Sequence, residues 1–456
     1  MSYTTFEEFC EKADSLTNLE KRTDNYSVRE YRLDRMKALL LHIGNPQEKY
    51  KSIHIAGSKG KGSTAIFIAN ALKAIGIKTA LYMSPHLIDY RERFTLSGSF
   101  IEDSILVEAA NIFTSKIQDF SFSDDIGPSH PTTFEIYTAY AFFLFSYINC
   151  EMAVIETGLG GRLDATNIIT PILSIITPIE LEHTAILGNT LEKIAVEKSK
   201  IIKQTIPVCI SRQTSVVRQV LEKEAQEKAS RLYDLMGEVE SISAKTTQER
   251  EIVDISWVNG KATHLKLRMR GEVSGENSAL ALLALKVAGL YKEGISEKAL
   301  EETTLVGRMQ LINTTPPIII DGAHTSESLR HLLNSINQLY KEEEKVVIFG
   351  ALEDKDHIHM IRLLLPVFSH IIISRPGTFK KSNVEDLYNL FRKEIEHEKS
   401  DTSLYLEKEA PRALNLALNL SKGVNPIIVT GSFYLAGDIL TSYNEMNEEQ
   451  QEIVCP

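Results

Sequence analysis

The sequence is short of cysteine and has no long apolar run, and each absence excludes a class of protein. Its four cysteines lie far apart and form no Cys-x-x-Cys pair, which argues against a zinc ribbon or a disulfide framework. The richest apolar run, Tyr137 to Ile148, is shorter than the ~20 helical residues that span a bilayer, so we expect a buried helix there. The first residues lack the apolar core of a signal peptide. A reducing, cytoplasmic location fits these features best.

An excess of positive charge is also missing. The 61 acidic side chains outnumber the 50 basic ones, and a formal charge of −11 disfavours a broad surface for nucleic acid or an anionic membrane. We expect neither partner, and an anionic small molecule would need a local basic site. The 456 residues exceed one ordinary core and predict two or three domains, while 43% hydrophobic and 24% charged residues are typical of a soluble globular protein.

What the sequence does have is a glycine-rich loop between a strand and a helix. The stretch IHIAGSKGKGST, residues 53–64, follows a strand expected over Ser52 to Ala56 and precedes a helix that ends at Gly76. The usual phosphate loop has four residues between its first Gly and the Gly-Lys pair, with Ser or Thr directly after the Lys. Here two residues separate Gly57 from Gly60, and a glycine follows Lys61.

Two interpretations of this loop are open, a flexible basic turn and a nucleotide site. Its setting favours the nucleotide, because backbone N–H groups and a helix N-terminus attract phosphate and Lys61 adds a point charge. The residues expected to bind are Gly57, Ser58, Lys59, Gly60, Lys61, Gly62, Ser63 and Thr64.

Other apolar runs also end in polar, glycine-rich loops. Met152 to Ile155 precedes ETGLGGRLDATN, and Leu173 to Ile176 precedes TPIELEHTAILGNT. Later runs precede DGAHTSES, GALEDKD, SRPGTFKKS and VTGSFYLAG. In open α/β sheets ligands collect beyond the carboxyl ends of the strands, so we expect the site in these loops.

The pattern changes between the two groups of strands. Residues 251–269, with Asn259-Gly260 at their centre, predict a β-hairpin, and a helix is expected from about Asn277 to Tyr291. The acidic residues 120–131 are expected to form a loop. We place the domain boundary near Leu305, which gives domains over residues 1–304 and 305–456.

Several polar residues of the first domain have two interpretations each. The Ser84 hydroxyl suits Mg²⁺, although Ser-Pro at a strand end is commonly a turn. Glu135 follows Thr132 by three residues, so a capping box and a metal ligand are equally open. His183 is a lone loop histidine and Lys198 lies among helix-surface charges, so each alone is an ordinary structural residue.

The second domain offers Arg308, Asp321, His324 and Ser432. Asp321 ends an apolar run, and both it and His324 lie in a glycine turn. Arg308 is placed to stabilise charge on a transferred phosphate, or to form a salt bridge at the domain joint. Ser432 either binds a small carboxylate at a helix N-terminus or caps that helix.

Together these pieces resemble the folylpolyglutamate synthase and dihydrofolate synthase family, relatives of the Mur ligases. The matching motifs, in the family's order, are RMKALLLHIGNPQ, IHIAGSKGKGST, SPHLIDYRERF, TTFE, ETGLGGRLDATN, LEHTAILGNTLEKIA, GRMQ, DGAH, GALEDKD and VTGSFYLAG. They extend from about Arg32 to Gly437, nearly the whole chain. The short glycine loop is this family's own variant.

The resemblance implies an α/β fold with two parts. The first is a P-loop-type ATPase domain with a central, mainly parallel sheet, and the second is a smaller, Rossmann-like C-terminal domain that receives glutamate. It implies two Mg²⁺ sites and a carbamylated lysine at Lys198. The metal ligands would be Ser84, Glu135 and His183. ATP contacts would come from Lys61 to Thr64, Asn277, Arg308 and Asp321.

The resemblance also implies roles for the remaining residues. The acceptor side would use Ser84, Pro85, His86 and Arg93, and the glutamate side His324 and Ser432. The catalytic set would be Lys61, His183, Lys198, Arg308, Asp321 and His324. The departures from the family pattern are Lys59, Glu182, Ser199, Lys200, Ser274, Val306 and Thr325.

The implied reaction joins L-glutamate to folate or dihydropteroate at the expense of ATP. ATP phosphorylates the acceptor carboxylate, and the amine of glutamate then displaces phosphate from the acyl phosphate. We expect a monomer that acts on these small molecules. A Mur-like ligase with a non-folate acceptor is the first alternative. A P-loop nucleotide switch is the second, and it leaves the second domain and the ETGLGGRLDATN loop without a role.

Overall fold

The computed structural model describes residues 2–16, 32–126, 129–353, 355–377 and 382–454. The chain forms two compact units, and the main division falls between Thr303 and Thr304. The first unit contains Met1–Ser243, Asp254–Leu265 and Gly275–Thr303, and the second contains Ala244–Val253, Lys266–Ser274 and Thr304–Pro456. Each unit is described by itself below.

The first unit is built on an eight-stranded sheet in the order β4-β3-β2-β5-β1-β6-β7-β8. The pairs from β2 to β8 are parallel, and β3 and β4 join the β2 edge in antiparallel fashion. The strands are β1 (Lys51–Ala56), β2 (Thr79–Tyr82), β3 (Phe94–Leu96), β4 (Ser99–Phe100), β5 (Met152–Glu156), β6 (Leu173–Ile176), β7 (Val208–Ile210) and β8 (Leu232–Asp234).

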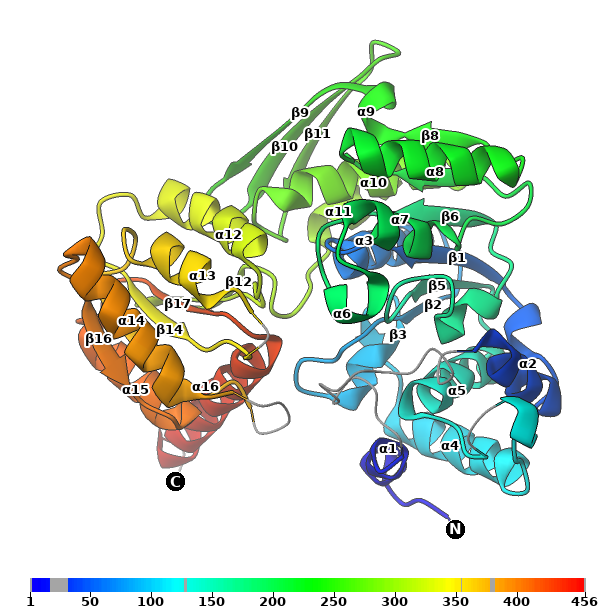
Figure 1. Cartoon of the computed structure of the whole chain (residues 1–456), viewed down its shortest axis with the longest axis horizontal. Coiled ribbons are helices and arrows are strands. Elements are labelled where there is room, and N and C mark those ends of the chain that lie inside the picture. Colours follow the sequence, from blue (N-terminus) through cyan, green and yellow to red (C-terminus); the bar gives the residue numbers. More distant parts are fainter. Residues whose placement is uncertain (1, 17–31, 127–128, 354, 378–381, 455–456) are drawn as a thin grey trace. The chain divides into compact units, whose positions relative to one another are not determined.

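Helices cover both faces of this sheet, so its central strands are buried throughout. In β5, Ala153 and Ile155 point into the core formed with α1, α2, α4 and α5, and Val154 is buried on the opposite face. Figure 1 shows α3 and α5 on opposite sides of the sheet. The helices are α1 (Phe6–Asp14), α2 (Leu33–His42), α3 (Lys61–Ala74), α4 (Asp103–Ile117), α5 (Thr133–Tyr147), α6 (Thr184–Leu187), α7 (Leu191–Ser199), α8 (Ser215–Glu227), α9 (Leu235–Glu238), α10 (Val273–Val287) and α11 (Ile295–Glu302).

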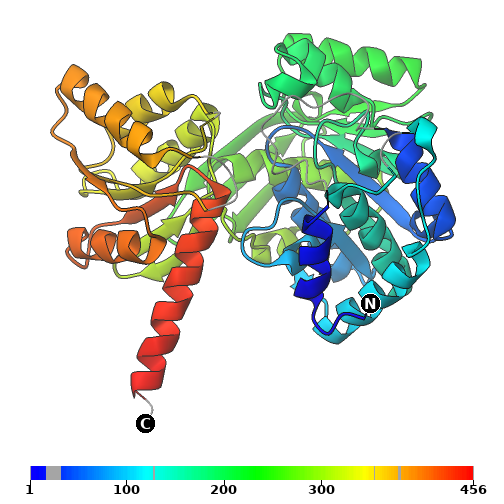
Figure 2. The same cartoon turned by 60° about the horizontal axis from the view of Figure 1, so that its bottom comes forward.

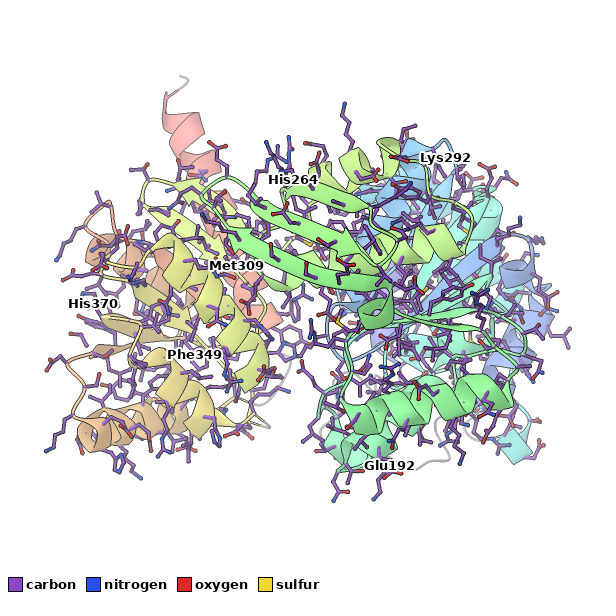
Figure 3. All side chains as sticks on the ribbon, turned by 90° about the horizontal axis from the view of Figure 1, so that it is seen from above. Glu192, His264, Lys292, Met309, Phe349 and His370 are labelled. Carbon is purple, nitrogen blue, oxygen red and sulfur yellow. The ribbon has the colours of Figure 1, made fainter. Side chains whose placement is uncertain are left out.

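A three-stranded sheet in the order β11-β10-β9 contributes residues to both units. Its strands are β9 (Val239–Thr246), β10 (Glu251–Trp257) and β11 (Ala262–Leu267). The predicted hairpin is confirmed, with a turn in which Gly260 donates to the Trp257 carbonyl. His264 on β11 is exposed and bonded to Asp254 (Figure 3). Strand β9 was not predicted, and α10 begins and ends earlier than the expected Asn277 and Tyr291.

The second unit holds a six-stranded sheet in the order β12-β13-β17-β14-β15-β16, parallel except for the β12–β13 pair. Its strands are β12 (Gln310–Thr314), β13 (Pro317–Ile320), β14 (Val346–Phe349), β15 (His370–Ile373), β16 (Ser403–Leu406) and β17 (Ile427–Thr430). Its helices are α12 (Ser326–Leu339), α13 (His357–Leu364), α14 (Val384–Glu398), α15 (Ala410–Leu420) and the long α16 (Phe433–Val454; Figure 2). The predicted α/β class is therefore confirmed.

Candidate active site

Four neighbouring parallel strands of the first unit end at the same edge of its sheet. The register pairs Ile55 of β1 with Glu156 of β5, and Tyr82 of β2 with Ile155. Strand β6 lies on the other side of β1. The loops that follow therefore begin side by side, and they are the glycine loop, the Ser84 segment, ETGLGGRLDATN and the His183 segment. The sheet thus gathers motifs that are far apart in the sequence.

The glycine loop is hydrogen-bonded to the loop that follows β6. The backbone N–H groups of Ser58 and Lys59 donate to the carbonyl of Pro178, at 2.8 and 3.3 Å. The Ser58 hydroxyl exchanges hydrogen bonds with the backbone of Glu180. Gly60 then caps α3 with a φ of 79°, so that Lys61 is the first residue of the helix. The loop residues therefore lie at a helix N-terminus, where an anion is stabilised.

Two glycines of the loop are required by close neighbours. A Cβ atom on Gly57 would lie 1.9 Å from Thr177 Oγ1, and one on Gly60 would lie 2.4 Å from Asn277 Oδ1. Both glycines also have positive φ, at 148° and 79°. The second distance places the Asn277 amide of α10 against the loop, so the sequence-predicted ATP residue Asn277 is brought to it.

The Lys61 amine forms an ion pair with a residue that the sequence reasoning missed. Glu156, the last residue of β5, has its carboxylate oxygen 3.7 Å from Lys61 Nζ, and it is only 5% exposed. It is also the first letter of the quoted ETGLGGRLDATN motif. The rule that ligands collect beyond strand ends would have found it, because it is an acid at the carboxyl end of a central strand.

Glu135 has different partners from those of Lys61. It forms the expected capping box with Thr132, receiving the Thr132 N–H at 2.8 Å. Arg35 donates to both of its oxygens, at 2.9 and 3.1 Å, and both side chains are buried. The same guanidinium binds the carbonyl of His130 and lies 3.9 Å from the centroid of Phe122. The structure thus shows the capping interpretation of Glu135, and its metal role stays a prediction.

Lys198 reaches the glycine loop from α7. Its buried amine donates to the carbonyl of Gly57 and to Glu182, both at 2.7 Å. Burial lowers the pKa of Lys198, although Glu182 opposes this effect. Burial raises the pKa of Glu182, but the charges of Lys198 and Lys61 outweigh it and leave that pKa at about 2. A lysine that resembles a surface charge in the sequence is therefore a buried cation at the loop.

Ser84 and His183 lie at the same sheet edge with different exposure. Ser84 is half-buried, two residues after the end of β2. His183 is exposed and precedes α6 in the left-handed conformation, with a φ of 46°. Ser84 follows β2 and His183 follows β6, the two outer members of the strand set β2-β5-β1-β6.

The ETGLGGRLDATN loop is fixed by a buried polar network. Asp164 accepts hydrogen bonds from Leu159 N–H, from Thr166 N–H and from the Thr166 hydroxyl. The Thr166 oxygen in turn lies 2.9 Å from His54 Nε2 on β1. The Thr166 proton is used on Asp164, so His54 must donate and is the Nε2–H tautomer. This agrees with His54 Nδ1, which is buried with no partner among the described residues.

The sequence-predicted acceptor residues form one group after β2. Pro85 is exposed, and His86 is half-buried. Arg93 is buried and donates from Nε to His86 Nδ1 at 2.9 Å.

In the second unit, the Phe433 ring contacts two of the predicted residues. The guanidinium carbon of Arg308 is 4.4 Å from the Phe433 ring centroid, and the His324 ring is 5.5 Å from it. Asp321 accepts from the N–H groups of Met309 and Ala323. Buried Ser432 accepts from Tyr434 N–H at the start of α16. The unit thus brings Arg308, His324 and Ser432 to the first turn of α16.

The departures from the family pattern are accommodated locally. Lys200 pairs with Glu224, and Thr325 caps α12 through a bond with Ser328. Ser274 donates to the carbonyl of Arg270, and Ser199 to that of Val196. Val306 is exposed, and Glu182 has the lysine contact given above.

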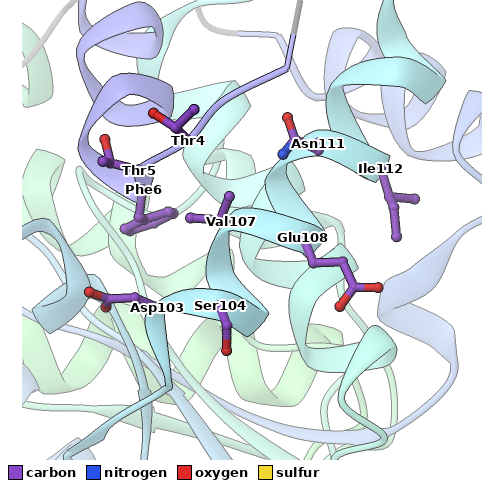
Figure 4. A pocket seen from close by; sticks show the side chains of 9 residues that line it. All are labelled: Thr4, Thr5, Phe6, Asp103, Ser104, Val107, Glu108, Asn111 and Ile112. Carbon is purple, nitrogen blue, oxygen red and sulfur yellow. The ribbon is translucent and has the colours of Figure 1, made fainter.

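A separate pocket lies between the start of α1 and α4 (Figure 4). Residues 4–6 line one side, and α4 residues such as Asp103, Val107 and Asn111 line the other. None of its lining residues is a sequence-predicted site residue. Within the described ranges, no helix combines the length and apolar character that a bilayer crossing needs.

Comparison with known proteins agrees with this arrangement. Residues 55–285 match the Mur ligase middle domain, and residues 307–433 match the Mur ligase glutamate ligase domain. The dihydrofolate synthase/folylpolyglutamate synthase of Bacillus subtilis (strain 168) is 32% identical to this chain, over 89% of this chain and 94% of its own length. The chain belongs to the folylpolyglutamate synthase and dihydrofolate synthase family. The resemblance stated from the motifs is therefore confirmed.

Other relatives give the same result. The folylpolyglutamate synthase of Lacticaseibacillus casei is 31% identical over 89% of this chain and 92% of its own. The crystal structure of the Mycobacterium tuberculosis folylpolyglutamate synthase complexed with ADP and AMPPCP has a TM-score of 0.85 at 25% identity, covering 96% of this chain and 98% of that one. The predicted enzyme class, an ATP-dependent ligase, is confirmed. A nucleotide switch without ligase chemistry does not explain matches to both Mur ligase domains.

Proposed function

We propose that this chain joins L-glutamate to a folate, to dihydropteroate, or to both, through an acyl phosphate formed with ATP. A carboxylate is a poor electrophile, so phosphorylation first provides a leaving group. The amine of glutamate then forms the amide bond, and phosphate and ADP leave. Catalysis of such a transfer depends on positioning and on stabilising charge on the phosphoryl group. The observation that carries the proposal is the contact of the buried Lys198 amine with the carbonyl of Gly57.

The nucleotide would bind at the glycine loop. The N-terminus of α3 and the Lys61 amine would hold the phosphates, and Asn277 would approach from α10. The Thr64 hydroxyl supports a ligand here, because it is buried in the first turn of α3 with no partner among the described residues. Such a group is normally paired unless a ligand or ion completes it.

Residues suited to Mg²⁺ adjoin this loop, and we assign the carboxylate ligand to Glu156 rather than Glu135. Glu156 is buried beside Lys61 at the end of β5, and Ser84 lies in the loop after the neighbouring strand β2. Glu135, in contrast, is bonded to Arg35 and Thr132. Oxygen ligands of this kind are what Mg²⁺ prefers. Ser84 and Glu156 would hold the first metal, which would neutralise charge on the transferring phosphate.

After carbamylation, Lys198 would supply a ligand for a second metal ion. Reaction with carbon dioxide requires the neutral amine, and burial, which lowers the pKa of Lys198, favours that form. The product is an anion beside Glu182, so nearby cations would be needed to hold it. This need fits a second Mg²⁺ at His183 and Lys198.

The second unit would bind glutamate. Arg308 and Asp321 would contribute to ATP, while His324 and Ser432 would lie on the glutamate side. We also propose a cytoplasmic location, since the described cysteines Cys10, Cys150 and Cys209 are free and buried, and a monomer. Sedimentation of the purified chain tests the monomer.

The assay that tests the function measures ADP release with each acceptor. Dihydropteroate and tetrahydrofolate would each be supplied with and without L-glutamate. Glutamate-dependent ADP release with either one is expected. ADP release only with a non-pterin acid would favour the Mur-like alternative, and no MgATP binding would contradict both.

Glu156 and Glu135 make different predictions for metal binding. Glu156→Gln should weaken the binding of Mn²⁺, used as a spectroscopic stand-in for Mg²⁺, by about tenfold or more, because a carboxylate ligand is lost. Glu135→Gln keeps an oxygen for the cap and should leave Mn²⁺ binding near the wild-type value. Electron paramagnetic resonance of free Mn²⁺ measures both. The opposite ranking would return the metal role to Glu135.

A further inference from the structure

Five side chains of the first unit form a closed ring of contacts at the segment SPHLIDYRERF. Asp14, the last residue of α1, accepts a hydrogen bond from the Tyr137 hydroxyl at 2.9 Å and from the Tyr90 hydroxyl at 3.1 Å. The Tyr90 ring lies 4.5 Å from the imidazole of His86. Arg93 donates to His86 Nδ1 at 2.9 Å, and its guanidinium carbon lies 5.1 Å from the Tyr137 ring centroid. The ring thus closes at Tyr137.

Each contact of this ring fixes the next group. Burial, reinforced by the charge of Asp14, raises the pKa of Tyr90 above its usual range, and burial does the same for Tyr137. Both phenols therefore remain protonated donors, and the Tyr137 hydroxyl also lies 3.1 Å from the carbonyl of Cys10, farther than from Asp14. The Nε atom of Arg93 only donates, so His86 Nδ1 must accept, and the neutral imidazole carries its proton on Nε2. The orientation and the tautomer of His86 are set by its neighbours.

We propose that Asp14 is a positioning residue for the acceptor acid, acting through Tyr90 and Tyr137 on His86 and Arg93. This inference rests on the proposed function, which places the acceptor beside Ser84 to Arg93. Helix α1 would thereby control a site to which it contributes no ligand. Hydrogen bonds to a charged acceptor hold geometry more firmly than neutral ones, which suits this role.

The same helix offers a matched control at its other end. Asn111 of α4 binds both backbone groups of Tyr3, accepting at 2.7 Å and donating at 3.0 Å. Asn111→Ala loosens the start of α1 and leaves the ring untouched. Asp14→Asn loosens the end of α1. It also replaces one of the two carboxylate oxygens that accept from the Tyr90 and Tyr137 hydroxyls.

Steady-state kinetics separate positioning from simple anchoring of α1. Asp14→Asn and Tyr90→Phe should each raise the KM for the acceptor by about tenfold, with the KM for ATP unchanged, as expected for the loss of a hydrogen bond to a charged group. Asn111→Ala should change neither KM. Equal effects of Asp14→Asn and Asn111→Ala on the acceptor would overturn the proposal, as would an unchanged acceptor KM in both ring variants.

A second measurement does not depend on turnover. Nitrogen-15 NMR of histidine-labelled protein distinguishes the two imidazole tautomers, and His86→Gln identifies the His86 signals. We expect the Nε2–H tautomer in the wild type and in Asn111→Ala, and a mixture in Asp14→Asn. An identical His86 signal in Asp14→Asn overturns the proposal. If the wild type turns over neither dihydropteroate nor tetrahydrofolate, the proposed function fails, while the tautomer result still decides whether Asp14 positions His86.

Discussion

At the scale of single residues, burial decides what each charged or polar group can do. Lys198 and His54 are both fully enclosed in the first unit, yet only Lys198 has a carboxylate partner. The Lys198 amine is therefore held by Glu182 and the carbonyl of Gly57. The histidine is a neutral link between β1 and the ETGLGGRLDATN loop.

Replacing Lys198 tests whether its amine is chemically required. Lys198→Ala should reduce turnover to below about 1% of the wild-type rate, a loss of ~3 kcal/mol or more in transition-state stabilisation. Partial rescue by a short carboxylic acid would support the carbamate. Lys193→Ala is the control, because Lys193 lies on the same helix, is exposed and donates to the Asn189 side chain, so it should be dispensable. Unchanged turnover in Lys198→Ala would refute the role.

Protonation of His54 should make the first unit sensitive to acid. Burial, helped by the charge of Lys203, lowers the pKa of His54 to about 3, whereas an unfolded histidine titrates near 6.5. Between these values the unfolded state binds more protons, so stability falls as the pH falls, by up to ~1.4 kcal/mol per pH unit. Urea unfolding followed by the single tryptophan, Trp257, measures this slope. His54→Gln should remove it, and an unchanged slope would contradict the prediction.

At the scale of elements, the start of α5 is tied to the preceding loop by one ion pair. Arg35 holds Glu135 with two hydrogen bonds and also binds the carbonyl of His130. Sequence reasoning identified the capping box from its spacing. The Arg35 contact lies 100 residues away in the chain and has no local signal.

Breaking this pair should destabilise the first unit strongly. Arg35→Met leaves the buried Glu135 carboxylate without its cation and should cost about 3–5 kcal/mol in the free energy of unfolding. The double variant Arg35→Met/Glu135→Gln should recover part of that loss, because no unpaired charge remains. Urea unfolding measures both variants. A double variant less stable than Arg35→Met alone would show that the pair is not the cause.

At the scale of the whole molecule, the glycine loop and Asn277 belong to one unit, so ATP should stabilise the two units differently. A non-hydrolysable ATP analogue with Mg²⁺ at 100 times its Kd should add ~2.7 kcal/mol to the unit that binds it. Scanning calorimetry should show a larger rise in transition temperature for the first unit, identified by Trp257 fluorescence, than for the second, which contributes fewer of the proposed ATP contacts. Lys61→Ala should abolish the shift. Equal shifts of both transitions would contradict independent unfolding of the units.

The elements could be predicted from the sequence more fully than the site. Runs such as Met152–Ile155 and Ile427–Val429 became strands, because their apolar side chains are buried on both faces of a parallel sheet. Strand β9 was missed since its pattern is half exposed. The site was harder, because Glu135 and Glu156 are both acids near motif boundaries. Their partners distinguish them, because Glu135 binds Arg35 and Glu156 lies beside Lys61.

The sequence by itself determined the family, the enzyme class, the strand and loop order and the glycine loop, because these depend on local pattern and on motifs kept in order along the chain. Only the tertiary structure decided which charges meet: Glu156 with Lys61, Lys198 with Gly57, and Asp14 with two phenols. The reason is physical. Parallel strands joined by helices bring distant loops to one sheet edge, and burial there turns ordinary side chains into paired, oriented groups.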